Sequence, residues 1–381
     1  MVSCRRYLWI SSWFAVVFAA CPPPHSPDDA GSVPADAGTR PPLGVAAVED
    51  LGGFSLPSPH VLSRDGASSG SFRGRILWTF GDTFLKDGRT NPADGTSVLS
   101  ATSGWSTVDQ PTLLTEPVDD AGVPAQLIPF TAAERDQNRV DALNGWALWP
   151  GAVVDTGASA ALVFFERIKR TNGSGFDAVG LGTGRVVADG TVAVRGDADL
   201  FSRGATDGGF RAVMGSGGIS VVDGQVYLFA CDPSGFLDFA CRVARAPVAE
   251  ADQASAYRFF DGSGWSPAAA SAAPVMDKVS VVSVSFNPYL QRYLAIGQRV
   301  LSNTALLRVA DRPEGPWTDP GVVIGPSDGG LLAPEAMGAT NYLTLEHVEL
   351  RSADGRQIVV SYARPMGPFL GEVRLARITL R

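Results

Sequence analysis

Residues 217–230 read GGISVVDGQVYLFA: two short apolar runs of alternating character, joined by an Asp-Gly turn. This pattern is typical of a β-hairpin, because glycine adopts the positive φ angles that tight hairpin turns need. Four other segments of the chain repeat the pattern, at residues 61–80, 151–166, 281–296 and 347–362. The sequence therefore predicts a chain built from similar hairpins.

The hairpins recur at a nearly constant interval. Their second strands end near Phe80, Phe165, Phe229, Ile296 and Tyr362. The last three intervals are each about 65 residues, and the first is longer because a loop around residues 111–144 intervenes. Third strands are expected at Ser97–Ala101, Ala178–Leu181, Cys241–Ala246, Ala305–Ala310 and Glu372–Ile378, and segments with Trp105, Trp265 and Trp317 follow three of them.

A repeat of this length with about four strands per unit predicts an all-β, five-bladed β-propeller over residues 46–381. The alternative is a β-sandwich, which gives no reason for the constant interval. No stretch shows convincing helical periodicity, and residues 249–256 form at most a short helical turn.

The N-terminus has the pattern of a targeting signal. Arg5 and Arg6 precede an uncharged run, residues 7–20, which ends in Phe18-Ala19-Ala20-Cys21 and resembles the lipobox of bacterial lipoproteins. We expect a signal peptide over residues 1–20 and a lipid on Cys21. The alternative is an ordinary cleaved signal with an incidental cysteine.

Residues 21–45 are rich in Pro, Asp and Ala and are expected to form an extended tether. Such a chain would be lipid-anchored in the cell envelope, at an outer membrane or cell surface rather than an inner membrane.

Two cysteines remain after Cys4 leaves with the signal and Cys21 takes the lipid. Cys231 and Cys241 flank a short turn, and in an oxidising compartment they are expected to form a disulfide. The alternative is two buried free thiols. The chain has three histidines, His25, His60 and His347, and their spacing does not suit metal binding. We expect no metal and no cofactor.

The charge pattern excludes some partners. The net charge is −8 and the arginines are scattered singly, so no basic stripe exists to bind nucleic acid. No apolar run after the N-terminal segment approaches the length of a membrane span. We expect a monomer that meets the membrane through its lipid alone.

Several segments resemble the DUF4185 group of five-bladed propellers, which is related to propeller glycoside hydrolases. The likeness covers roughly residues 48–381. It rests on Arg64-Asp65-Gly66, the WTFGDTF segment at residues 78–84, Trp149-Pro150-Gly151, residues 215–218, Glu314-Gly315-Pro316-Trp317, and Ser361-Tyr362-Ala363-Arg364. Some members of this group are endo-D-arabinanases, and the resemblance implies that Asp65 and Asp82 are the catalytic carboxylates.

Chemistry supports the same pair, because glycoside cleavage needs one carboxyl to protonate the leaving oxygen and a second to act as nucleophile or base. Asp82 follows the apolar run at residues 76–80 and is expected to emerge from a buried strand, a costly place for a carboxylate without a partner. Alternatively, both residues are structural: Asp82 accepts hydrogen bonds in its Gly-Asp-Thr turn, and Asp65 is part of a common Arg-Asp-Gly turn.

Five further residues are candidates for substrate binding. Glu166 holds Asp82's position in the second unit, although it could instead pair with Arg167 or Arg170. His347 and Glu349 are expected on one strand face, where they could bind sugar hydroxyls or simply be structural. Trp146 and Trp149 could stack on sugar rings or pack in the core.

The sequence thus predicts hydrolysis of a glycosidic bond in an extracytoplasmic polysaccharide, arabinan-like or related. The competing function is a non-catalytic propeller that binds carbohydrate or assembles at a surface. The position of Asp65 and Asp82 distinguishes the two: carboxyls that face each other across an open pocket favour the enzyme, and a carboxyl buried in a turn or salt-bridged away from the central channel of the propeller favours the binding protein.

Overall fold

The computed structural model describes residues 40–172, 175–188, 190–203, 215–235 and 238–381. The predicted signal peptide, Cys21 and the tether up to residue 39 lie outside these ranges. A compact unit spans Pro41–Arg381. Residues 41–45, which the sequence assigns to the tether, belong to this unit: the Arg292 guanidinium donates a hydrogen bond to the carbonyl of Pro41 (2.6 Å). No helix among the described residues is both long and apolar enough to cross a membrane.

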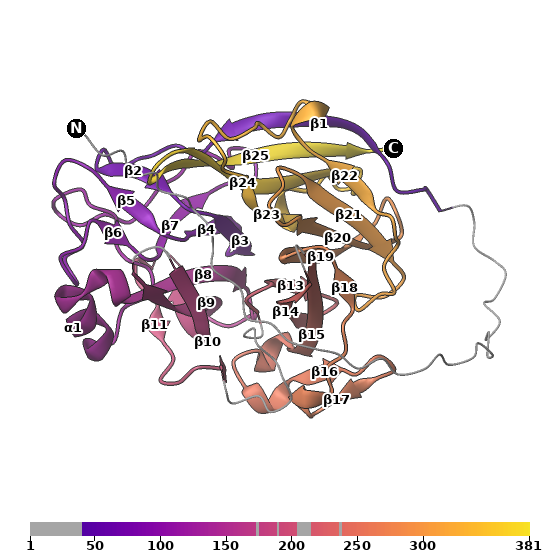
Figure 1. Ribbon diagram of the computed structural model, residues 1–381, viewed down its shortest axis with the longest axis horizontal. Coiled ribbons are helices and arrows are strands. Elements are labelled where there is room, and N and C mark those ends of the chain that lie inside the picture. The colour runs from indigo at the N-terminus through magenta and orange to yellow at the C-terminus, as the bar shows by residue number, and fades with distance from the viewer. Residues whose placement is uncertain (1–39, 173–174, 189, 204–214, 236–237) are drawn as a thin grey trace, which may run out of the picture. The chain divides into compact units, whose positions relative to one another are not determined.

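The described strands are antiparallel and form six sheets (Figure 1). One joins both ends of the unit, in the order β1 (Val45–Gly53), β25 (Leu370–Leu380), β24 (Gln357–Gly367) and β23 (Tyr342–Glu346). The next contains β11 (Val194–Arg195), β10 (Gly175–Val187), β9 (Ala160–Thr171) and β8 (Trp146–Val154), with β12 (Phe201–Ser202) paired to β10.

A further sheet contains β13 (Gly218–Val222), β14 (Gln225–Gly235), β15 (Asp238–Pro247), β16 (Arg258–Phe260) and β17 (Trp265–Ser266), with β18 (Met276–Asp277) paired to β15. Another contains β19 (Val281–Asn287), β20 (Arg292–Gln298), β21 (Ala305–Ala310) and β22 (Val322–Ile324). Two three-stranded sheets contain β3 (Ala67–Phe72), β4 (Arg75–Phe80) and β7 (Thr102–Ser106), and β2 (Val61–Arg64), β5 (Thr83–Leu85) and β6 (Val98–Leu99).

Five strands from five of the sheets contact one another in sequence: β3 with β8, β8 with β13, β13 with β19, β19 with β23, and β23 with β3. Glycines allow two of these approaches. A side chain at Gly70 would collide with the backbone of Val153, and one at Gly218, where φ is +127°, with that of Val282. The all-β prediction is confirmed. The predicted count of five blades is not, because the described strands form six sheets that do not close on themselves.

The hydrophobic core lies between neighbouring sheets. In one cluster Phe164 and Leu181, from β9 and β10, pack against Leu228 and Ala244, from β14 and β15. Alternating apolar residues on the strands supply these layers, so each sheet is covered by the next.

The structure corrects several predicted elements. The third strand of the first sequence repeat is β7, because β7 pairs with β4 whereas residues 98–99 pair with β5. The hairpin expected at residues 347–362 begins earlier: β23 ends at Glu346, and Val348–Leu350 form a 3₁₀ turn. Further 3₁₀ turns are Ala142–Asn144, Val248–Glu250, Ala254–Ala256, Ala269–Ser271 and Pro326–Asp328.

One α-helix was not expected from the sequence. Helix α1 spans Ala132–Val140, inside the long loop of the first unit. Thr131 and Glu134 form a capping box, in which each side chain accepts a hydrogen bond from the other residue's backbone. The Thr-x-x-Glu spacing is therefore the local signal that starts this helix.

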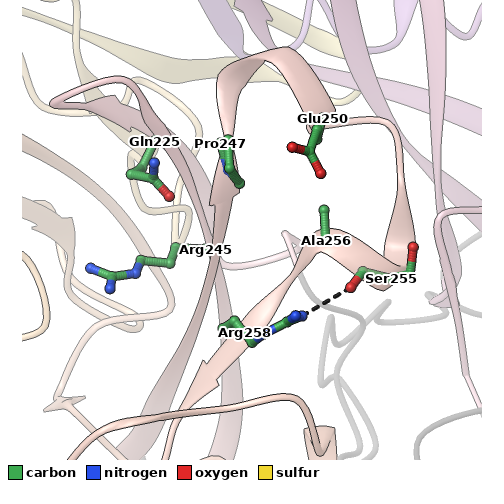
Figure 2. Close-up of a pocket in the computed structure, with 7 residues that line it drawn as sticks. All are labelled: Gln225, Arg245, Pro247, Glu250, Ser255, Ala256 and Arg258. Atoms are coloured by element: carbon green, nitrogen blue, oxygen red, sulfur yellow. Dashed lines mark hydrogen bonds between the residues drawn. The ribbon is translucent and has the colours of Figure 1, made fainter.

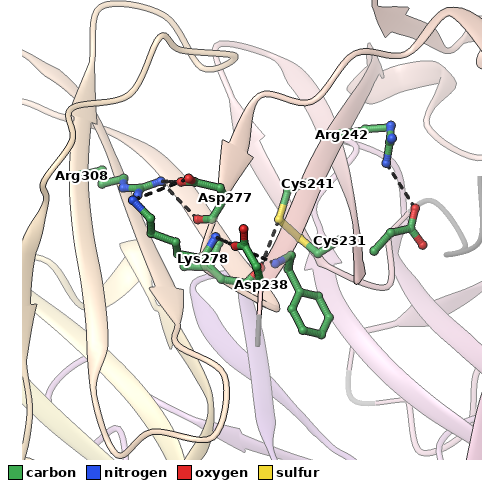
Figure 3. The surroundings of a disulfide bond; sticks show 10 residues. Cys231, Asp238, Cys241, Arg242, Asp277, Lys278 and Arg308 are labelled. Carbon is green, nitrogen blue, oxygen red and sulfur yellow. Dashed lines mark hydrogen bonds and ion pairs between the residues drawn. A yellow bond between two sulfur atoms is a disulfide. The ribbon is translucent and has the colours of Figure 1, made fainter. Parts of the chain in front are cut away.

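The predicted disulfide is present. Cys231 on β14 and Cys241 on β15 are directly opposite each other, with an S–S distance of 2.04 Å (Figure 3). The bond lies near the pair of Arg308 and Asp277 (2.8 Å), which links β21 to β18. It therefore cross-links the hairpin at the point where two sheets meet.

Candidate active site

Asp65 and Asp82 lie in two turns that are tied to each other. Asp82 follows β4, whose Leu77, Trp78 and Phe80 are buried, and its own side chain is almost buried, with 5% of the residue exposed. The Asp65 N–H donates to the Asp82 carbonyl (2.9 Å), and the Gly81 N–H donates to the Asp65 carbonyl (2.7 Å). The two carboxylates that the sequence singles out are therefore neighbours.

The next sheet supplies the partners of the Asp82 carboxylate. Arg170 on β9 donates from Nη2 to both carboxylate oxygens (2.8 Å each), and Trp149 on β8 donates from Nε1 to Oδ1 (3.1 Å). Trp149, predicted as a stacking residue, thus also holds Asp82 by a hydrogen bond. Arg170 was not predicted to serve the site. The sequence feature that could have identified Arg170 is its spacing of four residues from Glu166, which puts both side chains on one face of the strand.

The two aspartates have unlike electrostatic surroundings. Burial and the negative charge of Asp82 raise the pKa of Asp65 to about 7. Burial also raises the pKa of Asp82, but the Arg170 charge and the hydrogen bonds from Trp149 and Arg170 act in the opposite direction. Asp65 therefore titrates near neutral pH, although the Arg170 charge also favours its ionised form, whereas Asp82 is directly bound by a cationic and a neutral donor that offset part of the cost of burying its charge.

Glu166 lies close to this pair. It is directly opposite Trp149 across β9 and β8, so the two side chains share a face. Its carboxyl is half-buried and makes no hydrogen bond or ion pair within the described ranges. Burial raises the pKa of Glu166 to about 8. The pairing with Arg167 or Arg170 that the sequence left open is absent: Arg167 binds Glu134 (3.2 Å) and Asp199 (2.5 Å).

An aromatic pair flanks Asp82. Trp149 contacts Phe176 of β10 edge-to-face, with ring centroids 4.8 Å apart, and Phe176 is 59% exposed. Phe176 was missed by sequence reasoning, because a single aromatic residue after a turn carries no distinguishing signal. An exposed aromatic ring beside carboxylates suits contact with the apolar face of a sugar ring.

The other predicted tryptophan is not part of this cluster. Trp146 is three residues from Trp149 on β8, so the two point to opposite faces of the sheet. The charged groups of Arg167 and Lys169 lie 5.0 and 4.6 Å from its ring. Its predicted role in substrate binding stays a prediction.

His347 and Glu349 form a separate cluster with Ser69 of β3. The Ser69 Oγ lies 2.5 Å from His347 Nδ1 and donates a hydrogen bond to Glu349. His347 is 2% exposed and packs against Trp78, and burial lowers its pKa to about 3. The expected shared strand face is wrong, since both residues lie beyond the end of β23. Their role in binding sugar hydroxyls stays a prediction.

Within the described part of the chain no group of three or more His, Cys, Asp or Glu side chains could hold a metal ion.

The model of a family described as a domain of unknown function, DUF4185, matches residues 189–368. No curated protein matches the chain.

Solved structures with the same fold include three bacterial proteins. A proposed hydrolase from Bacteroides ovatus has a TM-score of 0.56 and 16% identity, covering 84% of this chain and 86% of its own. A family 117 glycoside hydrolase from Zobellia galactanivorans has a TM-score of 0.55 and 11% identity, with coverages of 88% and 90%. The GH43_1 enzyme of Xanthomonas citri, in complex with xylotriose, has a TM-score of 0.50 and 13% identity, with coverages of 85% and 90%.

Identities this low show a common fold and nothing about activity. That fold is the β-propeller of glycoside hydrolases, which confirms the predicted β-propeller but not its count of five blades. The resemblance to DUF4185 that the sequence predicts is confirmed by the family model, and residues 189–368 carry it.

Proposed function

We propose that this chain is a glycoside hydrolase in which Asp65 is the general acid and Asp82 is the nucleophile or general base. One observation carries the proposal: two adjacent carboxyls have unlike surroundings, since Arg170 and Trp149 bind the Asp82 carboxyl directly, whereas that of Asp65 makes no hydrogen bond or ion pair with the described residues. Glycoside cleavage needs this division between a protonated and an ionised carboxyl.

Each carboxyl has a defined task. Asp65, with a pKa of about 7, gives its proton to the glycosidic oxygen as the bond to the anomeric carbon breaks. Asp82 either attacks the anomeric carbon or takes a proton from the water that attacks it. Arg170 and Trp149 are positioning residues that hold the Asp82 carboxylate in place and offset part of the cost of burying its charge.

The surroundings of the carboxyls suit a sugar. Phe176 and Trp149 offer an aromatic surface, and the unpaired Glu166 carboxyl can hydrogen-bond a sugar hydroxyl. The family 117 and GH43_1 neighbours are glycoside hydrolases, and the resemblance to DUF4185 points to an arabinan-like or related extracytoplasmic polysaccharide.

A non-catalytic propeller that binds carbohydrate is the second candidate. The observation in its favour is the burial of Asp82 together with its ion pair to Arg170, because a carboxylate held in this way can be a purely structural element.

A reducing-sugar assay distinguishes the two candidates. The full chain is incubated with a panel of arabinans, xylans and galactans, and new reducing ends are counted. An enzyme releases them from at least one glycan, and Asp82→Asn does not. Asp261→Asn, in an exposed turn, is the matched control and should retain activity. Retardation of a glycan in affinity electrophoresis without release of reducing ends would establish the binding protein instead.

We also propose that the chain is an envelope lipoprotein anchored through Cys21. The support is the sequence pattern of residues 1–21 and the Pro-rich segment that follows it. Cys21→Ser should move the protein from the membrane fraction to the soluble fraction. A variant that stays in the membrane fraction, together with no incorporation of labelled fatty acid by the wild type, would refute the anchor.

A further inference from the structure

A second aromatic surface lies beside the two carboxyls, formed by Phe84 of β5 and Phe369 at the tip of the β24–β25 hairpin. The two rings contact each other, with centroids 5.7 Å apart. Phe369 is 65% exposed, the next residue, Leu370, is 42% exposed, and Phe84 is half-buried. These side chains present an apolar surface to solvent, and the active site proposed above does not include it.

Phe84 shares one strand face with both carboxyls. Strands β2 and β5 pair Ser63 with Phe84, and two steps along this ladder the Asp65 N–H donates to the Asp82 carbonyl (2.9 Å). Side chains two residues apart on a strand point to the same face, so Phe84 and the two aspartates lie on one side of the ladder. Two residues of strand measure about 7 Å, so the aromatic surface begins one short step from the carboxyls.

The backbone of the hairpin tip attaches it to β2. The Ser63 hydroxyl donates a hydrogen bond to the Phe369 carbonyl (2.9 Å), and strands β2 and β25 are in contact (Figure 1). Because this hydrogen bond uses a backbone carbonyl, any residue at position 369 can accept it. Attachment of the hairpin therefore does not explain why the residue at this position is aromatic.

The backbone conformation of Phe369 is one that bulky residues rarely adopt. Its φ angle is +56°, in the left-handed region that glycine and asparagine enter far more readily. Phe369 is the second residue of a two-residue turn between the paired residues Gly367 and Leu370, a position that usually holds glycine when φ is positive. Residues in such conformations gather at ligand sites, so a mostly exposed ring kept in this turn indicates a role in binding.

We infer that Phe84 and Phe369 bind a sugar unit of the glycan, next to the unit that lies at Asp65 and Asp82. The exposed face of an aromatic ring suits contact with the apolar face of a sugar. The inference rests on the proposed function in naming a glycan as the ligand, but it concerns binding and not cleavage. Phe369 contacts the bound glycan and takes no part in proton transfer.

The two aromatic surfaces belong to different neighbours of the sheet that leads to Asp82. Trp149 and Phe176 lie on β8 and β10, whereas Phe369 lies at the tip of β24 and β25, in the sheet that also contains β23. Strand β3, which pairs with β4 just before Asp82, contacts β8 of the first sheet and β23 and β24 of the second. A glycan held by both surfaces therefore passes over the carboxyls and occupies at least two sugar positions.

A cavity on β14–β16 offers a contrast. It measures about 400 Å³, its lining includes Arg245, Glu250 and Arg258, and no aromatic residue lines it (Figure 2). It therefore provides no ring on which a sugar can stack, and a substitution there serves as a control for the aromatic surface.

Affinity electrophoresis of the full chain at low temperature, in gels that contain arabinan, xylan or galactan, tests the inference. At least one glycan should retard the wild type, and the retardation at increasing glycan concentration gives a dissociation constant. Phe369→Asn should weaken this binding about tenfold, whereas Phe369→Tyr keeps a ring and should stay within about twofold of the wild type. Because asparagine tolerates the left-handed conformation, the melting temperature of Phe369→Asn should not fall. Phe84→Leu keeps an apolar side chain without a ring and should also weaken binding.

Two controls make the test specific, and both should leave binding unchanged. Phe286→Asn removes another aromatic residue, 43% exposed, whose ring contacts that of Tyr293 at 5.4 Å. Arg258→Gln alters the cavity of Figure 2.

Three results would overturn the inference: no retardation of the wild type by any of the three glycans, wild-type affinity in Phe369→Asn, or weaker binding by Phe369→Asn together with a lower melting temperature, which would make Phe369 a packing residue. Release of reducing ends, measured in parallel, separates this inference from the proposed function. Cleavage by the wild type with unchanged binding by Phe369→Asn overturns only the inference. Weakened binding by that variant with no cleavage by the wild type supports the inference and overturns only the hydrolase.

Discussion

At the scale of single residues, the active-site proposal depends on how each carboxyl is surrounded. Arg170 and Trp149 bind the Asp82 carboxyl, whereas within the described ranges the carboxyls of Asp65 and Glu166 make no hydrogen bond or ion pair. The sequence identified all three carboxyls but could not predict their environments, because the donors come from another sheet and depend on the packing between sheets.

Glu166→Gln should stabilise the protein above neutral pH and have little effect at pH 4.5. The pKa of Glu166 is about 8 in the folded state, well above its ordinary value, so folding favours the protonated form. Wild-type stability therefore falls as the pH rises towards 8, and the neutral glutamine avoids this loss. We expect a gain of about 1–3 kcal/mol at pH 9, after allowance for the half-buried position.

Thermal melting at pH 4.5 and pH 9 measures this effect. Glu49→Gln, an exposed glutamate on β1, is the matched control and should show no such gain at pH 9. If Glu166→Gln lowers the melting temperature equally at both pH values, the carboxyl has a partner and is not an isolated buried acid.

At the scale of secondary structure, alternation and turn residues predicted most hairpins correctly. The pairs β8–β9, β13–β14 and β19–β20 lie where the sequence places them. The failures have physical causes. The strand expected at residues 97–101 pairs with β5 and not with β4, because this part of the chain contributes to two short sheets and not to one. Strand β23 begins upstream of its predicted position.

Helix α1 was missed because it is short and polar, so its stability depends on local caps and tertiary ion pairs. Glu134 accepts hydrogen bonds from Arg195 (2.6 and 3.0 Å) and Arg167 (3.2 Å) as well as from its own capping box. These contacts connect α1 to β9 and β11. Hydrophobic periodicity cannot reveal a helix held in this way.

Thr131→Ala should lower the free energy of unfolding by about 1 kcal/mol, because it removes the hydroxyl that accepts the Glu134 N–H. Thr131→Ser keeps a hydroxyl at that position and should recover most of the loss. Urea denaturation of both variants measures the difference. Equal stabilities of the alanine and serine variants would show that the cap contributes nothing measurable.

At the scale of the whole folded unit, its first and last strands meet in one sheet. Strand β1 pairs with β25 along its length, and β25 in turn pairs with β24 (Figure 1). This pairing covers an edge that would otherwise be open. The sequence placed the domain start at residue 46, inside β1, but the pairing of β1 with the last strand could not be derived from local pattern.

Removal of residues 1–40 should leave the melting temperature unchanged, because the compact unit begins at Pro41. Removal of residues 1–53 should abolish cooperative unfolding or cause aggregation, since β1 and its pairing with β25 are lost. Calorimetry and size-exclusion chromatography measure both outcomes. A shorter protein that elutes without aggregates and melts as cooperatively as the longer one would show that β1 is dispensable.

The central claim is that Asp82 performs chemistry and is not only a partner for Arg170. The most direct measurement is turnover by Asp82→Asn on a cleaved glycan, taken together with its melting temperature. Asparagine keeps the size of the side chain and can still accept hydrogen bonds from Trp149 and Arg170. The proposal predicts a loss of about 10²–10⁴-fold in rate at a nearly unchanged melting temperature. A variant that melts several degrees lower and turns over at the wild-type rate would contradict it.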